Sequence, residues 1–246
     1  MKISFFEEFP TEKSLSKLEL VKFKTKIYLA EYHIEGFKQY KKELKNVELI
    51  WWPILNHSDG YWLSPFSKRK AMLKLFNQLL KENMPLLWDA ELPKDRGLIF
   101  TQIFKFFINR SMIRNFFKMY KGQIYTAEYS LQKGLLKSLL TFFGLSFDPK
   151  LYGNKIIKMF YTSMHNYLEE FLEREIKEGV EKYADNFLVG IGCIAIGING
   201  NEQLLKLEQL KRDLELCEKA GVKEVVIFRL GGLNKEYLNV INKYVD

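Results

Sequence analysis

Eight short apolar runs alternate along the chain with segments whose apolar residues recur at helical spacing. The runs are too short for helices and read as buried strands. Strands that alternate with helices pair in parallel, and a repeat of about 30 residues is typical of a (β/α)8 barrel. We therefore predict an α/β fold with one (β/α)8 barrel domain over residues 1–246; an open doubly wound sheet is the alternative. The predicted strands are residues 2–6, 26–30, 47–52, 85–90, 123–127, 155–161, 186–191 and 223–228.

The intervening segments carry ordinary helix signals. Thr11 is a good N-cap, Pro65 suits a first helical turn, and Gly221 ends an amphipathic run. Helices are expected over residues 11–21, 34–44, 64–82, 95–121, 134–143, 165–183, 201–220 and 234–244.

The fourth predicted strand carries the best catalytic candidates. It is bounded by Pro85 and Pro93 and turns acidic at its end, with Asp89 and Glu91. Because side chains alternate along a strand, Leu87, Asp89 and Glu91 share one face. Two carboxylates one strand repeat apart are costly to bury unless something pairs or uses them.

A short repeat extends this acidic set. Residues 27–32 (IYLAEY) and 124–129 (IYTAEY) nearly coincide, and residues 88–92 (WDAEL) are a looser copy. The repeat predicts that Glu31, Glu91 and Glu128 lie at equivalent heights at the carboxyl-terminal mouth, where barrel active sites are built. Glu7 and Glu8 end the first strand and join the same set.

Clustered carboxylates raise one another's proton affinity, so one can act as an acid while another stays ionised, as glycoside hydrolysis requires. The alternative is that ion pairs with Arg229 or lysines, or loop amides, occupy these carboxylates. The predicted catalytic residues are Glu91, Asp89, Glu128 and Tyr161. The predicted substrate-binding residues are Glu31, Trp52, Trp62, Trp88, His57, His165 and Arg229, since aromatic faces suit sugar rings as well as ordinary packing.

Two strands also resemble a known family. Asp89-Ala-Glu91 is similar to the D-x-E of chitinase-type glycoside hydrolases, and Met159-Phe-Tyr161 is similar to their Met-x-Tyr. The resemblance implies that Glu91 is the general acid. It also implies that Asp89 orients an acetamido group serving as nucleophile and that Tyr161 supports that group. Leu86 and Leu87 stand where the family's motif has an upstream aspartate and glycine.

A second hypothesis is a metal-dependent isomerase or lyase acting on a phosphorylated small molecule. Glycine-rich loops after the last two strands could present backbone amides to a phosphate. The three histidines could form an oxygen-rich metal site with Glu31, Asp89 and Glu128. No HxH or HExxH spacing is present, so the first hypothesis includes no metal ligand and no cofactor. The candidate phosphate-binding residues are Gly190, Gly192, Gly231 and Gly232.

A third hypothesis is a non-catalytic barrel that binds a ligand or a membrane surface. Residues 100–120 interleave phenylalanines with Lys and Arg, which is typical either of an outer barrel helix or of a segment lying on an anionic membrane. No nucleic-acid-binding motif is present. The sequence alone does not indicate the oligomeric state.

Composition and the N-terminal sequence bear on the cellular compartment of the protein. The net charge is +8, and there are only two cysteines, Cys193 and Cys217, without CxxC spacing. The small number of cysteines and an N-terminus that lacks a signal-peptide pattern predict a cytoplasmic protein. No apolar run reaches the length of a membrane span. Richness in Lys and Glu is typical of thermophile proteins.

Overall fold

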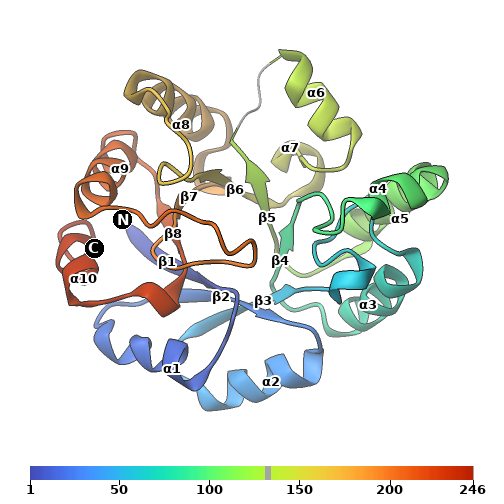
Figure 1. Ribbon diagram of the computed structural model, residues 1–246, viewed down its shortest axis with the longest axis horizontal. Coiled ribbons are helices and arrows are strands. Elements are labelled where there is room, and N and C mark those ends of the chain that lie inside the picture. The colour runs from blue at the N-terminus through green and yellow to red at the C-terminus, as the bar shows by residue number, and fades with distance from the viewer. Residues whose placement is uncertain (131–133, 246) are drawn as a thin grey trace. The chain divides into compact units, whose positions relative to one another are not determined.

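The computed structural model describes residues 1–130 and 134–245. Within these ranges eight strands form a closed barrel in the order β1 to β8, which confirms the predicted (β/α)8 fold class (Figure 1). The strands are β1 Lys2–Glu7, β2 Lys26–Glu31, β3 Glu48–Pro53, β4 Leu86–Asp89, β5 Ile124–Tyr129, β6 Lys155–Phe160, β7 Phe187–Gly192 and β8 Glu224–Phe228.

The helices follow the predicted order, with several differences at their ends, one of which, the later start of α3, is explained below. The helix expected over residues 95–121 is broken by a 3-10 turn, and those expected from residues 165 and 201 begin later. The helices are α1 Glu12–Leu15, α2 Ile34–Glu43, α3 Arg69–Glu82, α4 Gly97–Thr101, α5 Phe106–Met119, α6 Gly134–Phe142, α7 Pro149–Tyr152, α8 Glu169–Tyr183, α9 Leu207–Lys219 and α10 Lys235–Ile241.

The chain divides into two compact units. Unit 1 comprises residues 1–30, 40–50 and 157–246, and unit 2 comprises residues 31–39 and 51–156. The sequence prediction of one domain over residues 1–246 stays a prediction.

Unit 1 is organised around β1, which pairs in parallel with β2 and β8. Phe6 lies beside Tyr28 and Phe228, and their rings pack together at centroid distances of 5.5 and 6.2 Å. Near the start of the same strands Glu224 accepts hydrogen bonds from Ser4 and Tyr28 and pairs with Lys26. These contacts tie the two ends of the sequence into one group of strands.

Unit 2 is organised around the pair β4 and β5, with α3 and α5 packed on one face. Trp88 is fully buried and contacts Phe76 of α3 and Phe116 and Phe117 of α5. Phe117 in turn stacks on Phe147 at 4.1 Å. The burial of these large aromatic side chains stabilises the unit.

A buried turn explains why α3 starts later than the Ser64-Pro65 pair predicts. Ser67 Oγ donates to the Trp62 carbonyl, and Asn109 of α5 donates to the Pro65 and Ser67 carbonyls. These side-chain bonds satisfy buried backbone groups in a non-helical conformation, so the first helical residue is Arg69. Across the described residues, the helices all fall short of the length and apolarity needed to cross a bilayer.

Candidate active site at the end of strand β4

The two carboxylates singled out by sequence lie at and just beyond the end of β4. Trp88 faces the helices, so Asp89 next to it points to the opposite face, the inner face of the barrel. Asp89 is buried. The Ala90 amide donates to the Ala127 carbonyl, so the pairing with β5 continues one residue past the strand and brings Glu91 to its rim.

Register decides which side chain Glu91 meets. Asp89 is aligned with Ala127, which places Glu91 beside Tyr129. The Tyr129 hydroxyl donates a hydrogen bond of 3.2 Å to Glu91 Oε2. Asp89 also lies close enough for its charge to act on Tyr129. The structure therefore brings Asp89, Glu91 and Tyr129 together, and Tyr129 was not among the residues predicted from sequence.

Burial is the main influence on the protonation of Glu91 and Tyr129. It raises the pKa of the half-buried Glu91 carboxyl to about 7, against smaller lowering effects of the Tyr129 hydrogen bond and the Arg96 charge. The pKa of Tyr129 is also raised, first by burial and then by the charges of Glu91 and Asp89. Near neutral pH Glu91 is thus divided between its acid and its ionised form, while Tyr129 keeps its proton.

Glu128 is separated from this group, contrary to the repeat-based expectation. Its side chain lies on the helix-facing side of β5, as does that of Thr126, which is aligned with Trp88. Asp89 is aligned with Ala127 and lies on the other face. Glu128 Oε1 accepts hydrogen bonds from Thr126 Oγ1 and from the Phe147 amide, both at 2.9 Å, and the side chain is fully buried. This carboxylate anchors the chain near Phe147 instead of meeting Asp89 and Glu91.

Glu31 also turns toward a helix. Its Oε1 accepts from the Tyr32 and His33 amides at 2.7 and 3.2 Å, directly before α2. The side chain lies against Gly36, where an added Cβ would be 2.8 Å from the Glu31 carboxyl carbon. The carboxylate therefore satisfies amides at the start of α2, a stabilising position for a negative charge.

In unit 1 the carboxylates of β1 are held by the protein itself. Glu7 pairs with Arg229 at 2.7 Å and accepts from the Gly231 and Phe9 amides. Burial raises the pKa of Glu7 despite the neighbouring Arg229 charge. Glu8 Oε2 accepts from the Ile198 amide. Arg229, predicted to bind substrate, instead neutralises a buried carboxylate.

The glycines predicted to bind phosphate are engaged within unit 1. The Gly231 amide donates to Glu7 and the Gly232 amide to the Arg229 carbonyl. Gly190 and Gly192 lie inside β7, paired with Val226 and Phe228 of β8. In these positions the glycines serve strand pairing and close packing, and the amides at Gly231 and Gly232 already have acceptors.

Tyr161 and His165 follow β6 in unit 1. The Tyr161 ring packs on Phe228 at 5.9 Å and against Gly192, where a Cβ would come within 2.9 Å of it. The His165 amide donates to the Tyr161 carbonyl, and its ring lies 5.5 Å from that of Tyr167.

The aromatic residues differ in what they can offer a ligand. Trp88 is fully buried between β4 and two helices, where its ring contacts other aromatic side chains. Trp62 is buried with its ring edge against Tyr61. Trp52 is buried and follows Trp51, which stacks on Phe37 of α2, so Trp52 points to the inner face. His57 is exposed and stacks on Tyr61 at 5.0 Å.

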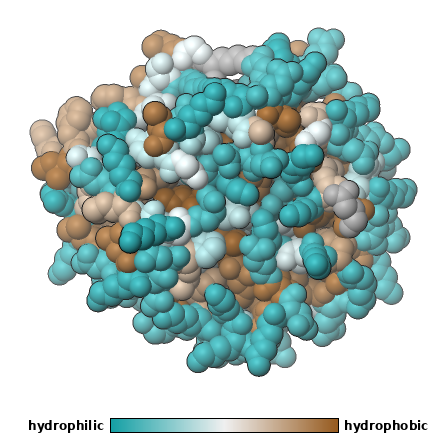
Figure 2. Space-filling model, turned by 180° about the vertical axis from the view of Figure 1, so that it is seen from behind, coloured by the Kyte–Doolittle hydropathy of each residue, from teal (hydrophilic) through white to brown (hydrophobic). Residues whose placement is uncertain are grey.

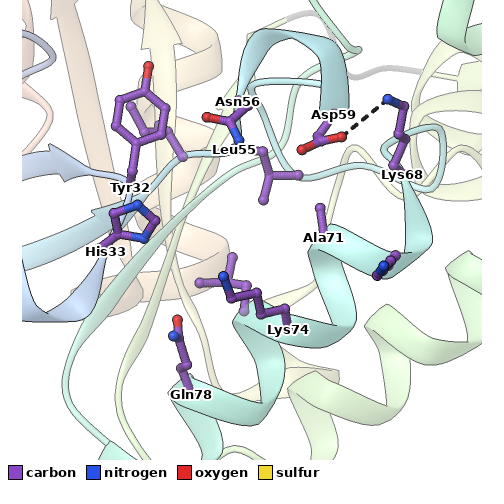
Figure 3. A pocket seen from close by; sticks show the side chains of 12 residues that line it. Tyr32, His33, Leu55, Asn56, Asp59, Lys68, Ala71, Lys74 and Gln78 are labelled. Atoms are coloured by element: carbon purple, nitrogen blue, oxygen red, sulfur yellow. Dashed lines mark ion pairs between the residues drawn. The ribbon is translucent and has the colours of Figure 1, made fainter.

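A cavity of about 590 Å³ opens beyond the carboxyl ends of β2 and β3 in unit 2 (Figure 3). Tyr32 and His33 follow β2, Asn56 follows β3, and α3 contributes Lys70, Lys74 and Gln78. Sequence reasoning missed it. The available signal was the four-residue spacing of those three α3 residues, which places them on one helix face.

Hydrogen bonds connect the rim of this cavity to the segment that follows β4 and contains Glu91. Lys68 pairs with Asp59 at 3.3 Å, and its amide donates to the Asp59 carbonyl (Figure 3). The adjacent Gly60 carbonyl accepts from the Lys94 amide, three residues after Glu91. The loop after β3 therefore connects the cavity to the segment that leaves β4.

The histidines do not assemble a metal site within the described residues. No group of three or more His, Cys, Asp or Glu side chains among residues 1–130 and 134–245 has a geometry that could hold a metal ion. His33 lines the cavity beside α3, and His57 stacks on Tyr61.

Comparison with solved structures finds barrels of the same fold at low identity. A class V chitinase from Pseudomonas fluorescens Pf-5 has a TM-score of 0.61 and 10% identity, over 99% of each chain. The spore cortex-lytic enzyme SleL of Bacillus cereus has a TM-score of 0.61 and 10% identity, over 100% of this chain and 74% of its own. The catalytic domain of a β-amylase from Paenibacillus polymyxa has a TM-score of 0.57 and 9% identity, over 99% and 97%.

The distant resemblance to chitinase-type barrels stated from the β4 motif is thus confirmed at the level of fold. No family model matches the sequence, and no curated protein matches it.

Proposed function

We propose that this protein is a carbohydrate-active hydrolase in which Glu91 is the general acid. The observation that carries the proposal is the Glu91 carboxyl at the end of β4, whose pKa burial raises to about 7. With this pKa a substantial fraction of the carboxyl groups still holds the proton at neutral pH and can give it to a leaving oxygen. The fold shared with chitinases and a β-amylase supports the same class of reaction.

The neighbours of Glu91 fit the role of an acid. Tyr129 donates to Oε2 and so fixes the orientation of the carboxyl group. That bond and the Arg96 charge favour the ionised form, which limits the rise in pKa and lets the acid give up its proton. Asp89, one strand repeat back on the same face, would orient the substrate, as the resemblance to the D-x-E motif implies.

Substrate binding is proposed at the same end of unit 2. Trp52 is proposed to line the site from the inner face of β3, and His57 in the loop after β3 offers an exposed polar side chain. The cavity beyond β2 and β3 adds Tyr32, Asn56 and Gln78, whose hydroxyl and amide groups can hydrogen-bond to sugar hydroxyls.

The test is hydrolysis of a panel of aryl glycosides that includes N-acetylglucosamine oligosaccharides. Glu91→Gln keeps the size of the side chain and removes its proton, so activity should fall by about 10²- to 10⁴-fold. Glu48→Gln is the matched control, because Glu48 is an exposed carboxylate at the first residue of β3. The activity of the wild type should also decline as pH rises through about 7.

Two results would contradict the proposal. One is a folded wild type that releases no aglycone from any member of the panel. The other is an activity that Glu91→Gln and Glu48→Gln reduce to the same extent, because the acid would then lie elsewhere.

A further inference from the structure

The positive charge of the protein is concentrated in one segment. Between residues 96 and 147 the sequence has a single acidic residue, Glu128, and that carboxylate is fully buried. The whole chain has a net charge of +8, and this segment contributes most of it. Its basic residues are Arg96, Lys105, Arg110, Arg114, Lys118, Lys121, Lys133 and Lys137.

The same segment exposes large apolar side chains. Phe104 is 92% exposed, Leu135 78%, Phe100 76% and Phe107 66%. Surface phenylalanines this exposed are unusual, and a contiguous group of them marks an interaction site. We call this group the aromatic–basic surface; its further apolar members are Ile103, Ile108, Met119, Leu136, Leu139 and Phe142.

Contacts within unit 2 link the parts of this surface on α5 and α6. The ring of Phe142 in α6 packs on Phe106 and Phe107 of α5 at 5.4 and 6.2 Å, and the Arg110 guanidinium lies 5.2 Å from its centroid. In Figure 2 brown and tan spheres gather at the edge where α4 and α5 lie when Figure 1 is turned.

The packing of α5 accounts for this exposure. Its inner face is already apolar, because Ile113, Phe116 and Phe117 pack toward Trp88 and the other buried aromatic residues. An outer barrel helix is normally polar on the opposite side. Here Phe107, Ile108 and Met119 occupy that side, and with α3 they line a groove of about 580 Å³.

We propose that the aromatic–basic surface binds the face of an anionic lipid bilayer. Elements with bulky apolar residues among Lys and Arg lie in the interface plane, with the apolar side chains in the acyl boundary and the cations at the headgroups. Exposed aliphatic residues such as Ile103 and Leu135 suit lipid better than nucleic acid, whose bases stack on aromatic rings. The absence of exposed carboxylates from residues 96 to 147 removes repulsion from the headgroups.

The test is co-sedimentation with two kinds of vesicle, one of phosphatidylcholine and phosphatidylglycerol and one of phosphatidylcholine alone. The wild type should bind the anionic vesicles, bind neutral ones at least about ten-fold more weakly, and lose affinity as salt rises. Phe104→Asp should lower binding to anionic vesicles by about ten- to a hundred-fold. Leu168→Asp is the matched control, since Leu168 is 77% exposed and lies outside the surface.

The variants should keep the thermal unfolding profile of the wild type, because Phe104 and Leu168 are both largely in solvent. A wild type that fails to bind anionic vesicles would overturn the proposal. So would equal binding by Phe104→Asp and the wild type. Two other outcomes would assign the surface to another partner. In the first, the protein binds single-stranded RNA but no vesicles. In the second, the wild type is a dimer that Phe104→Asp dissociates, while vesicle binding stays unchanged.

Discussion

Glu91→Gln should change how the stability of the protein depends on pH. The pKa of Glu91 is raised from its ordinary 4.5 to about 7 by burial, and such a rise corresponds to about 3 kcal/mol. Below pH 4.5 both folded and unfolded chains hold the proton, so the carboxyl has no penalty. As pH rises toward 7 the unfolded chain ionises first, and the folded state loses stability.

Above pH 7 the folded chain carries the buried carboxylate, and the full penalty of about 3 kcal/mol is present. Glutamine at this position is neutral at every pH and avoids that penalty. Glu91→Gln should therefore gain about 3 kcal/mol relative to the wild type between about pH 4 and pH 8.

The measurement is urea unfolding of both proteins across this pH range, with the difference in their free energies of unfolding as the quantity compared. Glu48→Gln controls for the loss of one carboxylate from an exposed position. A difference between Glu91→Gln and the wild type that stays constant with pH would refute the reasoning. The reasoning would also be refuted if the free energy of unfolding of the wild type rose relative to that of the variant with increasing pH, because the folded state would then favour the carboxylate.

Three further predictions concern residues that stabilise the fold. Trp88→Ala should destabilise the protein by about 3–5 kcal/mol in urea unfolding, since the indole is fully buried among Phe76, Phe116 and Phe117; a loss under about 1 kcal/mol would contradict this. Glu7→Ala should cost about 3–5 kcal/mol by leaving Arg229 without its partner, and Arg229→Met in the same background should recover part of the loss. Gly232→Ala should lower the melting temperature far more than Gly190→Ala, because its Cβ would come within 1.8 Å of the Ile194 carbonyl oxygen against 3.4 Å for the nearest atom at Gly190.

The fold could be predicted because its signals are local. Each strand is a short apolar run between breakers, and all eight predicted runs coincide with strands to within a few residues. Helix ends were less predictable, because distant side chains set them. Asn109 lies more than forty residues from Pro65 in sequence, yet its amide holds the turn that delays the start of α3.

The cavity beyond β2 and β3 could not be predicted in the same way. Its walls come from loops after two strands and from one face of α3, and only the fold brings them together. The regular spacing of Lys70, Lys74 and Gln78 reads equally well as an ordinary solvated helix face. Tyr129 was missed for a related reason, since its role depends on the side chain it meets across the sheet and not on its own neighbours in sequence.

One residue of register decides which side chains meet at the end of β4. Aligning the Ala-Glu pairs of the fourth and fifth strands by sequence would put Glu91 opposite Glu128. The observed register aligns Asp89 with Ala127, so Glu128 is displaced by one position from that alignment. A shift of one residue moves a strand side chain to the other face of the sheet. Glu128 therefore faces the helices and receives the Phe147 amide, while Tyr129 reaches Glu91. Asp89, Glu91 and the Tyr129 hydroxyl meet in place of the larger set of carboxylates that was predicted. The raised pKa of Glu91 comes chiefly from burial rather than from repulsion between carboxylates.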